Sequence, residues 1–192
     1  MTDPDEIARD GDIAIRPMRD APEDYVLFVR WRNEPHVAEW WNTDEDPVPM
    51  TLEHARAEYG PGADAWVSGC IISIAGRPVG YVQFYPWSSE LDEAREIGVP
   101  DPDASFGLDI FIGEPDTVGH GVGAAVVALV SRHLFETEGA TSVALLTPVG
   151  NDRAHRAYEK AGFRKVRQTL DTDVVDGERR MSWLMVLDRP LG

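Results

Sequence analysis

Residues 107–136, GLDIFIGEPDTVGHGVGAAVVALVSRHLFE, constrain the fold more than any other part of the chain. An apolar strand leads into a loop with glycine at three alternate positions, and a helix rich in alanine and valine follows. Glycine weakens a helix, so glycine at a helix start indicates that the backbone must approach something closely. The unpaired N–H groups of a helix start bind anions, and the segment therefore predicts a phosphate site.

The same segment opens a strand–helix–strand crossover, because TSVALLTP at residues 141–148 again has the composition of a strand. A crossover of this kind favours parallel pairing of its two strands. Two β-rich runs also surround AGRP at residues 75–78, and two more surround Asp176 and Gly177, which predicts hairpins. The chain is therefore predicted to be an α/β protein.

The other helices are predicted from apolar spacing and from their ends. Residues 23–41 have helical spacing, and Pro35 divides them into two helices. Thr51 as a cap and Gly60 as a stop delimit another helix. Residues 151–160 form a short helix after the crossover.

The rest of the chain is organised around one domain. Residues 1–12 are acidic and poor in apolar groups, so we expect a disordered leader before a single domain at 13–190. IAIRPM, from residue 13, has the alternation of a strand, and residues 88–104 are expected to form a long acidic loop. Cys70 is the single cysteine and is expected to be a buried thiol in a reducing compartment.

The net charge of -16 disfavours some classes of binding partner and favours others. An acidic surface repels nucleic acid phosphates and attracts cationic small molecules. No signal sequence precedes the first structured segment, and no apolar run is long enough to span a bilayer. We therefore expect a cytoplasmic protein that binds neither nucleic acid nor membranes.

Three phosphate-binding patterns compete for the glycine loop. A P-loop requires lysine and a hydroxyl residue after its last glycine, and neither Gly121 nor Gly123 is followed by them. The dinucleotide fingerprint matches GHGVGA, but it expects an acidic residue after the next strand, where this chain has Leu146, Thr147 and Pro148. Only one crossover is visible, whereas a dinucleotide fold needs several.

Residues 107–163 instead resemble the central motif of the GNAT superfamily of N-acetyltransferases, which bind acetyl-coenzyme A. In that family a strand leads into Q/R-x-x-G-x-G/A, and this chain has VGHGVG, with Val118 first. NDRAHRAYEKAGF, residues 151–163, is similar to the family segment N-x-x-A-x-x-x-Y-E-K-x-G-F. The resemblance implies the GNAT fold, a central, mostly antiparallel sheet with one parallel crossover, flanked by helices.

The resemblance also implies a coenzyme site without a metal. Main-chain amides of the glycine turn hold the pyrophosphate, and Tyr158 protonates the departing thiolate. The implied acetyl-coenzyme A contacts are Ile110, Phe111, Ile112, Val118, Gly119, His120, Gly121, Val122, Gly123, Ala124, Asn151, Ala154 and Tyr158.

A narrower resemblance, to aminoglycoside 6'-N-acetyltransferases, covers most of residues 13–188. Its pieces are VAEWW, GRPVGYVQFY, FGLDIFI and the YEKAGF helix. It implies transfer of an acetyl group from acetyl-coenzyme A to a primary amine of a cationic aminosugar, the 6'-amino group first, by direct attack in a ternary complex. Asp109 would bind or deprotonate that amine, and strand amides near Phe111 would polarise the thioester carbonyl.

The candidate acceptor residues also have a physical case. Asp109 is a carboxylate in an apolar strand, which is costly unless the group is paired or useful. Alternation puts Gln83 between Tyr81 and Tyr85 on one strand face, where they suit a polyhydroxylated ligand. Similar enzymes use loop carboxylates to bind ammonium groups, and Glu93 is the residue of the acidic loop that we expect to bind the substrate in this way.

Two adjacent tryptophans cannot share one helical face. Trp40 is expected to seal its helix against the sheet, and Trp41 to reach a cleft as a platform for a sugar ring or an ammonium group.

Two other functions remain open. Acyltransferases of siderophore assembly, which modify hydroxylysine-type amines, resemble the chain in the same regions, although their acceptors are less cationic. A GNAT domain that binds coenzyme A or a ligand without turnover is the other alternative. Thr147 stands at or next to the place where relatives often have an aspartate, so one cation contact of those relatives is missing. The chain is expected to be a monomer or a homodimer.

Overall fold

The computed structural model describes residues 5–190, which form one eight-stranded sheet and six α-helices. The strand order is β1-β2-β3-β4-β5-β6-β8-β7. The strands are β1 (Ala8–Asp10), β2 (Ile13–Pro17), β3 (Ser68–Ile74), β4 (Arg77–Pro86), β5 (Ser105–Ile112), β6 (Ser142–Pro148), β7 (Arg164–Val175) and β8 (Glu178–Asp188). The helices are α1 (Pro22–Arg32), α2 (Pro35–Trp41), α3 (Leu52–Tyr59), α4 (Leu91–Ile97), α5 (Val122–Glu136) and α6 (Asp152–Lys160).

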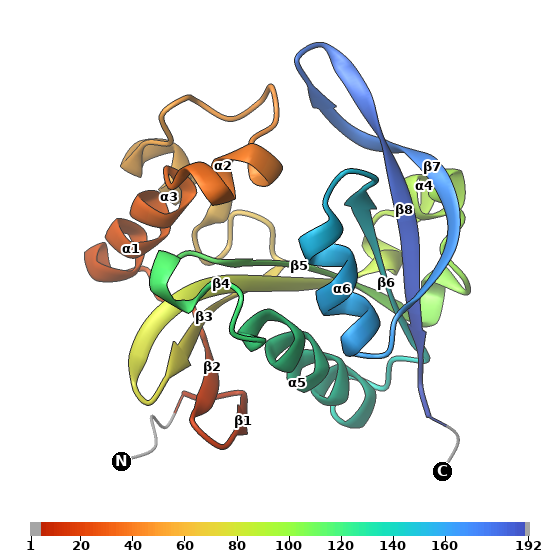
Figure 1. Ribbon diagram of the computed structural model, residues 1–192, viewed down its shortest axis with the longest axis horizontal. Coiled ribbons are helices and arrows are strands. Elements are labelled where there is room, and N and C mark those ends of the chain that lie inside the picture. The colour runs from red at the N-terminus through yellow and green to blue at the C-terminus, as the bar shows by residue number, and fades with distance from the viewer. Residues whose placement is uncertain (1–4, 191–192) are drawn as a thin grey trace.

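Helices cover both faces of the sheet (Figure 1). Helices α5 and α6 pack on one face, where the largest apolar cluster includes Leu108, Val126 and Tyr158. The other face carries two clusters, one under α1 to α3 and one under α4. The side chains of β5 alternate between the two faces, since Leu108 joins the first face and Phe111 joins the cluster under α1 to α3.

The sheet is mixed, as predicted, with β5 and β6 as its one parallel pair. They pair only through Ser105 with Ser142 and Phe106 with Val143, and the two serine hydroxyls lie 2.7 Å apart. No later pair between these two strands occurs within residues 5–190. The sheet therefore divides into a half with β1 to β5 and a half with β6 to β8, separated by an opening.

Most of the predicted elements are confirmed. Pro35 begins α2, the Thr51 side chain accepts a hydrogen bond from the His54 amide, and Gly162 closes α6 with φ at 101°. The β3–β4 and β7–β8 hairpins turn through residue pairs with positive φ, among them Asp176 at 55°. Glycine with positive φ thus occurs in these hairpin turns as well as in the glycine loop of the predicted anion site.

Two predictions about irregular segments are wrong. Residues 8–10, expected to belong to a disordered leader, form β1 and pair with β2, while residues 1–4 lie outside the described part. The acidic stretch from residue 88 to 104 is not a loop throughout, because it contains α4 and short 3-10 turns at its ends. Its apolar residues at helical spacing, Ala94 and Ile97, pack beneath β6 and β8 and explain the helix.

Candidate active site

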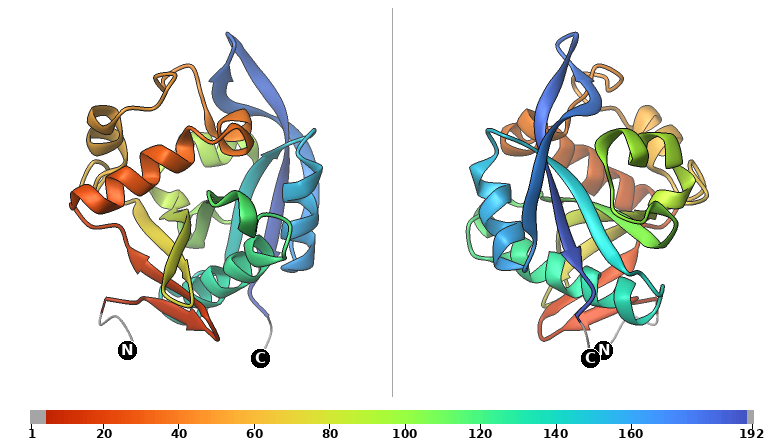
Figure 2. Two further views of the ribbon diagram at one scale, coloured as in Figure 1. Left: turned by 60° about the vertical axis from the view of Figure 1, so that its left-hand side comes forward. Right: turned by 90° about the vertical axis from the view of Figure 1, so that its right-hand side faces the viewer.

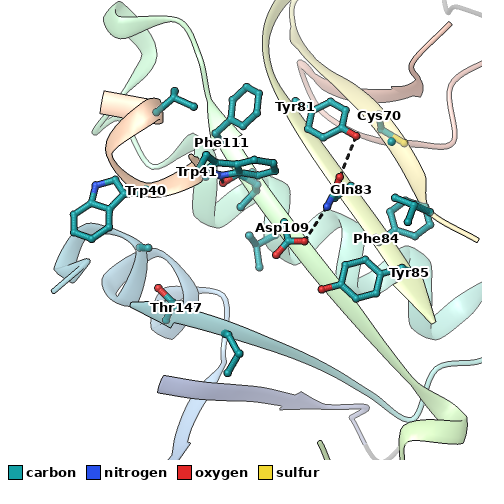
Figure 3. Close-up of a pocket in the computed structure, with 18 of the residues that line it drawn as sticks. Trp40, Trp41, Cys70, Tyr81, Gln83, Phe84, Tyr85, Asp109, Phe111 and Thr147 are labelled. Carbon is teal, nitrogen blue, oxygen red and sulfur yellow. Dashed lines mark hydrogen bonds between the residues drawn. The ribbon is translucent and has the colours of Figure 1, made fainter. Parts of the chain in front are cut away.

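A cleft of about 1640 Å³ occupies the opening between the two halves of the sheet. Its volume exceeds the roughly 300–1,000 Å³ of an ordinary small-molecule pocket, so it has room for two ligands. Every candidate site residue from the sequence lines this cleft except Val122, whose side chain packs against the main core. The side chains of the two halves converge there, as Figure 3 shows for Asp109 on β5 and Thr147 on β6.

One end of the cleft is the start of α5. Gly119 and Gly121 have φ of 86° and 83°, and a Cβ added at Gly119 or Gly123 would meet no atom within 4 Å. Helix α5 begins at Val122, so Gly123 lies in its first turn rather than in the loop before it. No side chain caps this helix, and its first turn contains no acidic residue. Free N–H groups and the positive end of the helix dipole therefore face open space, as an anion requires.

Two basic side chains from α6 line the same end. The Lys160 Nζ lies 3.5 Å from the position that a Cβ on Gly121 would take, and Arg156 is one turn earlier on the same helix face. Neither forms an ion pair with any carboxylate among the residues that the structure describes. The sequence analysis missed both, although their spacing of four residues was the available signal.

Helix α6 also places the predicted motif residues. The Asn151 Oδ1 accepts a hydrogen bond from the Ala154 amide at 3.1 Å and so caps the helix. Tyr158 is buried, its ring centroid lies 5.8 Å from that of Phe163, and Ala154 lines the cleft beside it. Burial is the main cause that raises the pKa of Tyr158 above its usual range, so its hydroxyl remains a proton donor at neutral pH.

The edge of β5 that faces the opening has no neighbouring strand along most of its length. The carbonyl of Ile110 accepts from Trp41 Nε1 at 3.3 Å, and that of Ile112 is 2.9 Å from His36 Nε2. Since the N–H and C=O of a strand residue point to the same edge, the amides of Ile110 and Ile112 face the opening too. The candidate hydrogen-bond donors near Phe111 are therefore the backbone amides of its two neighbours, Ile110 and Ile112.

One of the two expectations for the tryptophans is wrong: Trp40 does not seal its helix against the sheet, whereas Trp41 lines the cleft as expected. Trp41 meets Phe111 edge-on at 4.8 Å between ring centroids, so it seals α2 against the sheet. Trp40 lies across the cleft opening, with its six-membered ring 3.8 Å from where a Cβ of Gly150 would be. Both line the cleft.

The other end of the cleft is built on β4 and β5. The Tyr81 hydroxyl donates to Gln83 Oε1 at 3.2 Å, and Gln83 Nε2 donates to Asp109 Oδ2 at 3.0 Å (Figure 3). The Tyr85 ring crosses Gly107, where an added Cβ would lie 2.2 Å from the ring, and its hydroxyl is directed toward Asp109. The predicted face of tyrosines and glutamine thus serves to orient the carboxylate.

Asp109 is a carboxylate in an unfavourable environment. Burial raises its pKa to about 6, and the nearby charges of Asp171 and Glu93 act in the same direction. Hydrogen bonds from Gln83 and Tyr85 oppose the shift. A carboxylate with this pKa is charged at neutral pH and holds a proton more strongly than ordinary aspartates, which suits a general base.

Three further carboxylates surround Asp109. Glu93 of α4 accepts from Thr172 Oγ1 at 2.8 Å, Asp171 accepts from Ser182 at 2.8 Å, and Asp173 lines the cleft with them. Partial burial of the carboxyl group and the Asp171 charge raise the pKa of Asp173 to about 7. The residue as a whole is exposed, so solvent screens much of the repulsion from Asp171. Burial is likewise the main cause of the raised pKa of Glu93.

An irregularity in β7 brings these aspartates to the cleft. Leu170 pairs with Met181 and Val174 with Arg179, so three residues of β7 lie opposite one residue of β8. Such a bulge re-aims side chains. The sequence analysis missed Asp171 and Asp173, and the alternation in LDTDVV was the signal that they share a strand.

Two other cleft residues are inert. Cys70 is buried, and burial raises the pKa of its thiol to about 12, so the thiol is not a nucleophile at neutral pH. Thr147 is buried in the wall formed by β6. No group of three or more His, Cys, Asp and Glu within residues 5–190 is placed to hold a metal ion. No helix in that range is long and apolar enough to cross a membrane.

Comparison with known proteins identifies the family. Residues 20–170 match the model of an acetyltransferase (GNAT) domain. Aminoglycoside N(6')-acetyltransferase type 1 of Klebsiella pneumoniae is 30% identical over 152 residues, which cover 74% of this chain and 70% of that protein. N-hydroxyputrescine acetyltransferase of Acinetobacter baumannii is 26% identical over 140 residues, which cover 72% of this chain and 61% of that protein. The solved structure of AAC(6')-Ib in complex with ribostamycin and coenzyme A is 27% identical, with a TM-score of 0.79 over 94% of both chains.

The raised pKa of Asp109 predicts that removing its charge stabilises the folded chain, by an amount that depends on pH. Its pKa is about 6 in the folded chain and about 3.9 in an unfolded one, so this group's contribution to stability falls as the pH rises from about 4 to 6. Asp109→Asn should raise the free energy of unfolding by about 1–2 kcal/mol at pH 8 and by less at pH 5. Urea unfolding at both pH values measures this. Equal destabilisation at both would mean that the carboxylate itself holds the fold.

Proposed function

This chain belongs to the GNAT acetyltransferase family, and from that premise we propose that it transfers the acetyl group of acetyl-coenzyme A to the 6'-amino group of an aminoglycoside. The observation that carries the acceptor assignment is the set of carboxylates around Asp109 at one end of the cleft. A polycationic sugar supplies the ammonium groups that such a set attracts. The similarity to aminoglycoside acetyltransferases supports the same assignment.

The residues at the start of α5 fit the phosphates of the coenzyme. The amides of Val122, Gly123 and Ala124 open the helix without a capping side chain, and Lys160 and Arg156 supply positive charge beside them. A main-chain cradle does not use the side chain at the first position of the motif, so the departure at Val118 is tolerated. When bound, the coenzyme supplies an acetyl thioester as the acyl donor.

The open edge of β5 would align the thioester with the acceptor. The amides of Ile110 and Ile112 face the opening and can donate to the thioester oxygen, on which negative charge develops. Holding both substrates in line lowers the barrier further. We place Phe111, between these donors, as an apolar wall against Trp41.

Asp109 would accept a proton from the acceptor ammonium, directly or through water, and the free amine would attack the thioester carbon. A carbon–nitrogen bond forms and the carbon–sulfur bond breaks. As the carbon–sulfur bond breaks, Tyr158 would donate its proton to the sulfur, and the nitrogen would give up its second proton to water. Solvent then removes the proton from Asp109 and returns one to Tyr158. Burial, and to a lesser degree the Asp109 charge, raises the pKa of Tyr158, which supports assigning the two groups to one reaction. No covalent enzyme intermediate is needed.

Gln83, Tyr85 and Glu93 would orient Asp109 and the acceptor, and Trp41 would form one wall of the acceptor site. We add Asp171 and Asp173 as contacts for ammonium groups. All of these residues come from one chain, so a monomer or a homodimer could carry the site. Acetyl-coenzyme A and a reduced thiol at Cys70 are both consistent with reaction in the cytoplasm.

Thiol release from acetyl-coenzyme A tests the acceptor. We expect rapid release with aminoglycosides that carry a 6'-amino group and none with those that carry a 6'-hydroxyl group. Hydroxylysine, an N-hydroxylated diamine and simple polyamines complete the panel, because one relative acts on N-hydroxyputrescine. Release only with the N-hydroxylated amines would instead assign the protein to the acyltransferases of siderophore assembly. Tight coenzyme binding with no release from any acceptor would leave a binding domain.

Asp109→Asn tests the general base. In the unaltered chain kcat/KM should rise with pH through a midpoint of about 6, because only the charged carboxylate accepts a proton. The variant should lose about 10²–10⁴ in kcat and lose that acid limb. Coenzyme affinity, measured by calorimetry, should be unchanged. An unaltered pH profile in the variant would assign the proton transfer to another group.

Lys160→Met tests the phosphate end, and Lys165→Met is its matched control, since these are the two lysines of the chain. Lys165 pairs with Glu159 at 3.4 Å and lies over Trp183, outside the cleft. Lys160→Met should raise KM for acetyl-coenzyme A about tenfold, as the loss of one charge-assisted contact implies. Lys165→Met should leave it unchanged. S-acetylpantetheine lacks the pyrophosphate, so an equal loss with that donor would contradict the assignment.

A further inference from the structure

Residues 36–46, which comprise most of α2 and the loop after it, cross the open end of the cleft. Arg153 of α6 donates to the His36 carbonyl at 3.3 Å, and Arg180 of β8 donates to the Glu39 carbonyl at 3.4 Å. Further along, Asp44 contacts the turn between β7 and β8. This segment therefore links the N-terminal half of the sheet to α6, to β8 and to the β7–β8 turn on the far side of the opening.

Asp44 forms the shortest of these links. Its Oδ1 accepts from the Asp176 amide and its Oδ2 from the Gly177 amide, both at 2.8 Å. Its own amide donates to the Val174 carbonyl at 2.9 Å. The β7–β8 hairpin extends beyond the rest of the sheet (Figures 1 and 2), so these three bonds hold the end of a projecting element. We call them the Asp44 clasp.

The conformation of the turn explains why a carboxylate fits there. Asp176 and Gly177 have φ of 55° and 77°, as in the tight hairpin turn in which both central residues are left-handed. Their successive amides point away from the hairpin ladder and form a small concavity that binds anions. Hydrogen bonds with a charged acceptor are stronger than neutral ones.

The clasp matters for the cleft because of the bulge in β7. Regular pairing is interrupted between Leu170 and Val174, which separates the hairpin end from the rest of the strand. Asp171 and Asp173 lie in that interruption, Asp171 held by Ser182 on β8. Asp173 is the last residue of the interruption and precedes Val174, whose carbonyl takes part in the clasp. The Asp173 amide donates to Asp171 Oδ1 at 3.4 Å, so Asp173 is held by Asp171 on one side and by the clasp at Val174 on the other.

We propose that Asp44 is a positioning residue for the acceptor: it clasps the β7–β8 turn and thereby sets where Asp173 meets a cationic substrate. Asp44 does not touch the reacting atoms, and the coenzyme end of the cleft is independent of it. The effect on the acceptor rests on the function proposed above, whereas the clasp itself does not.

Amide hydrogen exchange of the unliganded protein tests the clasp. Asp44→Asn keeps the size of the side chain but sets an amide donor against one of the two turn amides. Asp176→Asn is the matched control, because it removes a charge at the same turn while the clasp uses only the Asp176 backbone. Exchange in the peptide around Asp176 and Gly177 should rise about tenfold in Asp44→Asn, equivalent to about 1.4 kcal/mol, and not in Asp176→Asn. Equal exchange in both variants and in the unaltered chain would overturn the clasp.

Steady-state kinetics test the positioning. Asp44→Asn should raise KM for the acceptor about fivefold to tenfold, with KM for acetyl-coenzyme A unchanged, and Asp176→Asn should change neither. Faster exchange without any change in acceptor KM would overturn the positioning role. If the unaltered chain acetylates no aminoglycoside, the proposed function fails, and the exchange comparison still decides whether the clasp exists.

Discussion

The short parallel contact between β5 and β6 determines the rest of this structure. Two residue pairs hold the strands together at one end, and beyond them the backbone of β5 has no strand to bond with. Polar backbone groups away from water must find partners. The His36 and Trp41 side chains satisfy two carbonyls of this edge, and the amides of the same residues remain available. A gap in a sheet thus becomes a row of oriented donors, with a cleft in front of it.

Opposite charges meet along that cleft. The chain carries a net charge of -16, yet Lys160 and Arg156 stand without carboxylate partners in the described residues beside the start of α5. The other end concentrates carboxylates to the point that burial and mutual repulsion raise the pKa of Asp109. That environment costs stability, because a buried charge is better solvated in the unfolded chain. The apolar clusters on both faces of the sheet offset this cost, although some of their members, such as Tyr158 and Phe111, also line the cleft.

The sequence predicts the coenzyme end of the cleft better than the acceptor end. The glycine turn, the helix after it and the capped α6 are local, so a few neighbouring residues specify each of them. Asp171 and Asp173 escaped prediction because a bulge, which depends on the pairing of β7 with β8, aims them at the cleft. The Asp44 clasp joins residues at least 130 positions apart. Trp40 lines the cleft instead of sealing its helix, because the orientation of α2 on the sheet is a tertiary feature that spacing along the chain does not specify.

This difference has a physical origin in the two kinds of recognition. A pyrophosphate held by main-chain amides needs contact at hydrogen-bond distance, and only a backbone of one shape provides it, so the glycine positions are fixed. Attraction between ammonium groups and carboxylates acts over several ångströms and depends on the sum of nearby charges. A carboxylate can therefore be supplied from one strand or another. Thr147 on β6 brings no charge to the cleft, and β7 brings two aspartates to it. A chain can in this way keep the electrostatics of its acceptor site while changing the residues that provide it, which is why motifs identify the donor and only the folded structure describes the acceptor.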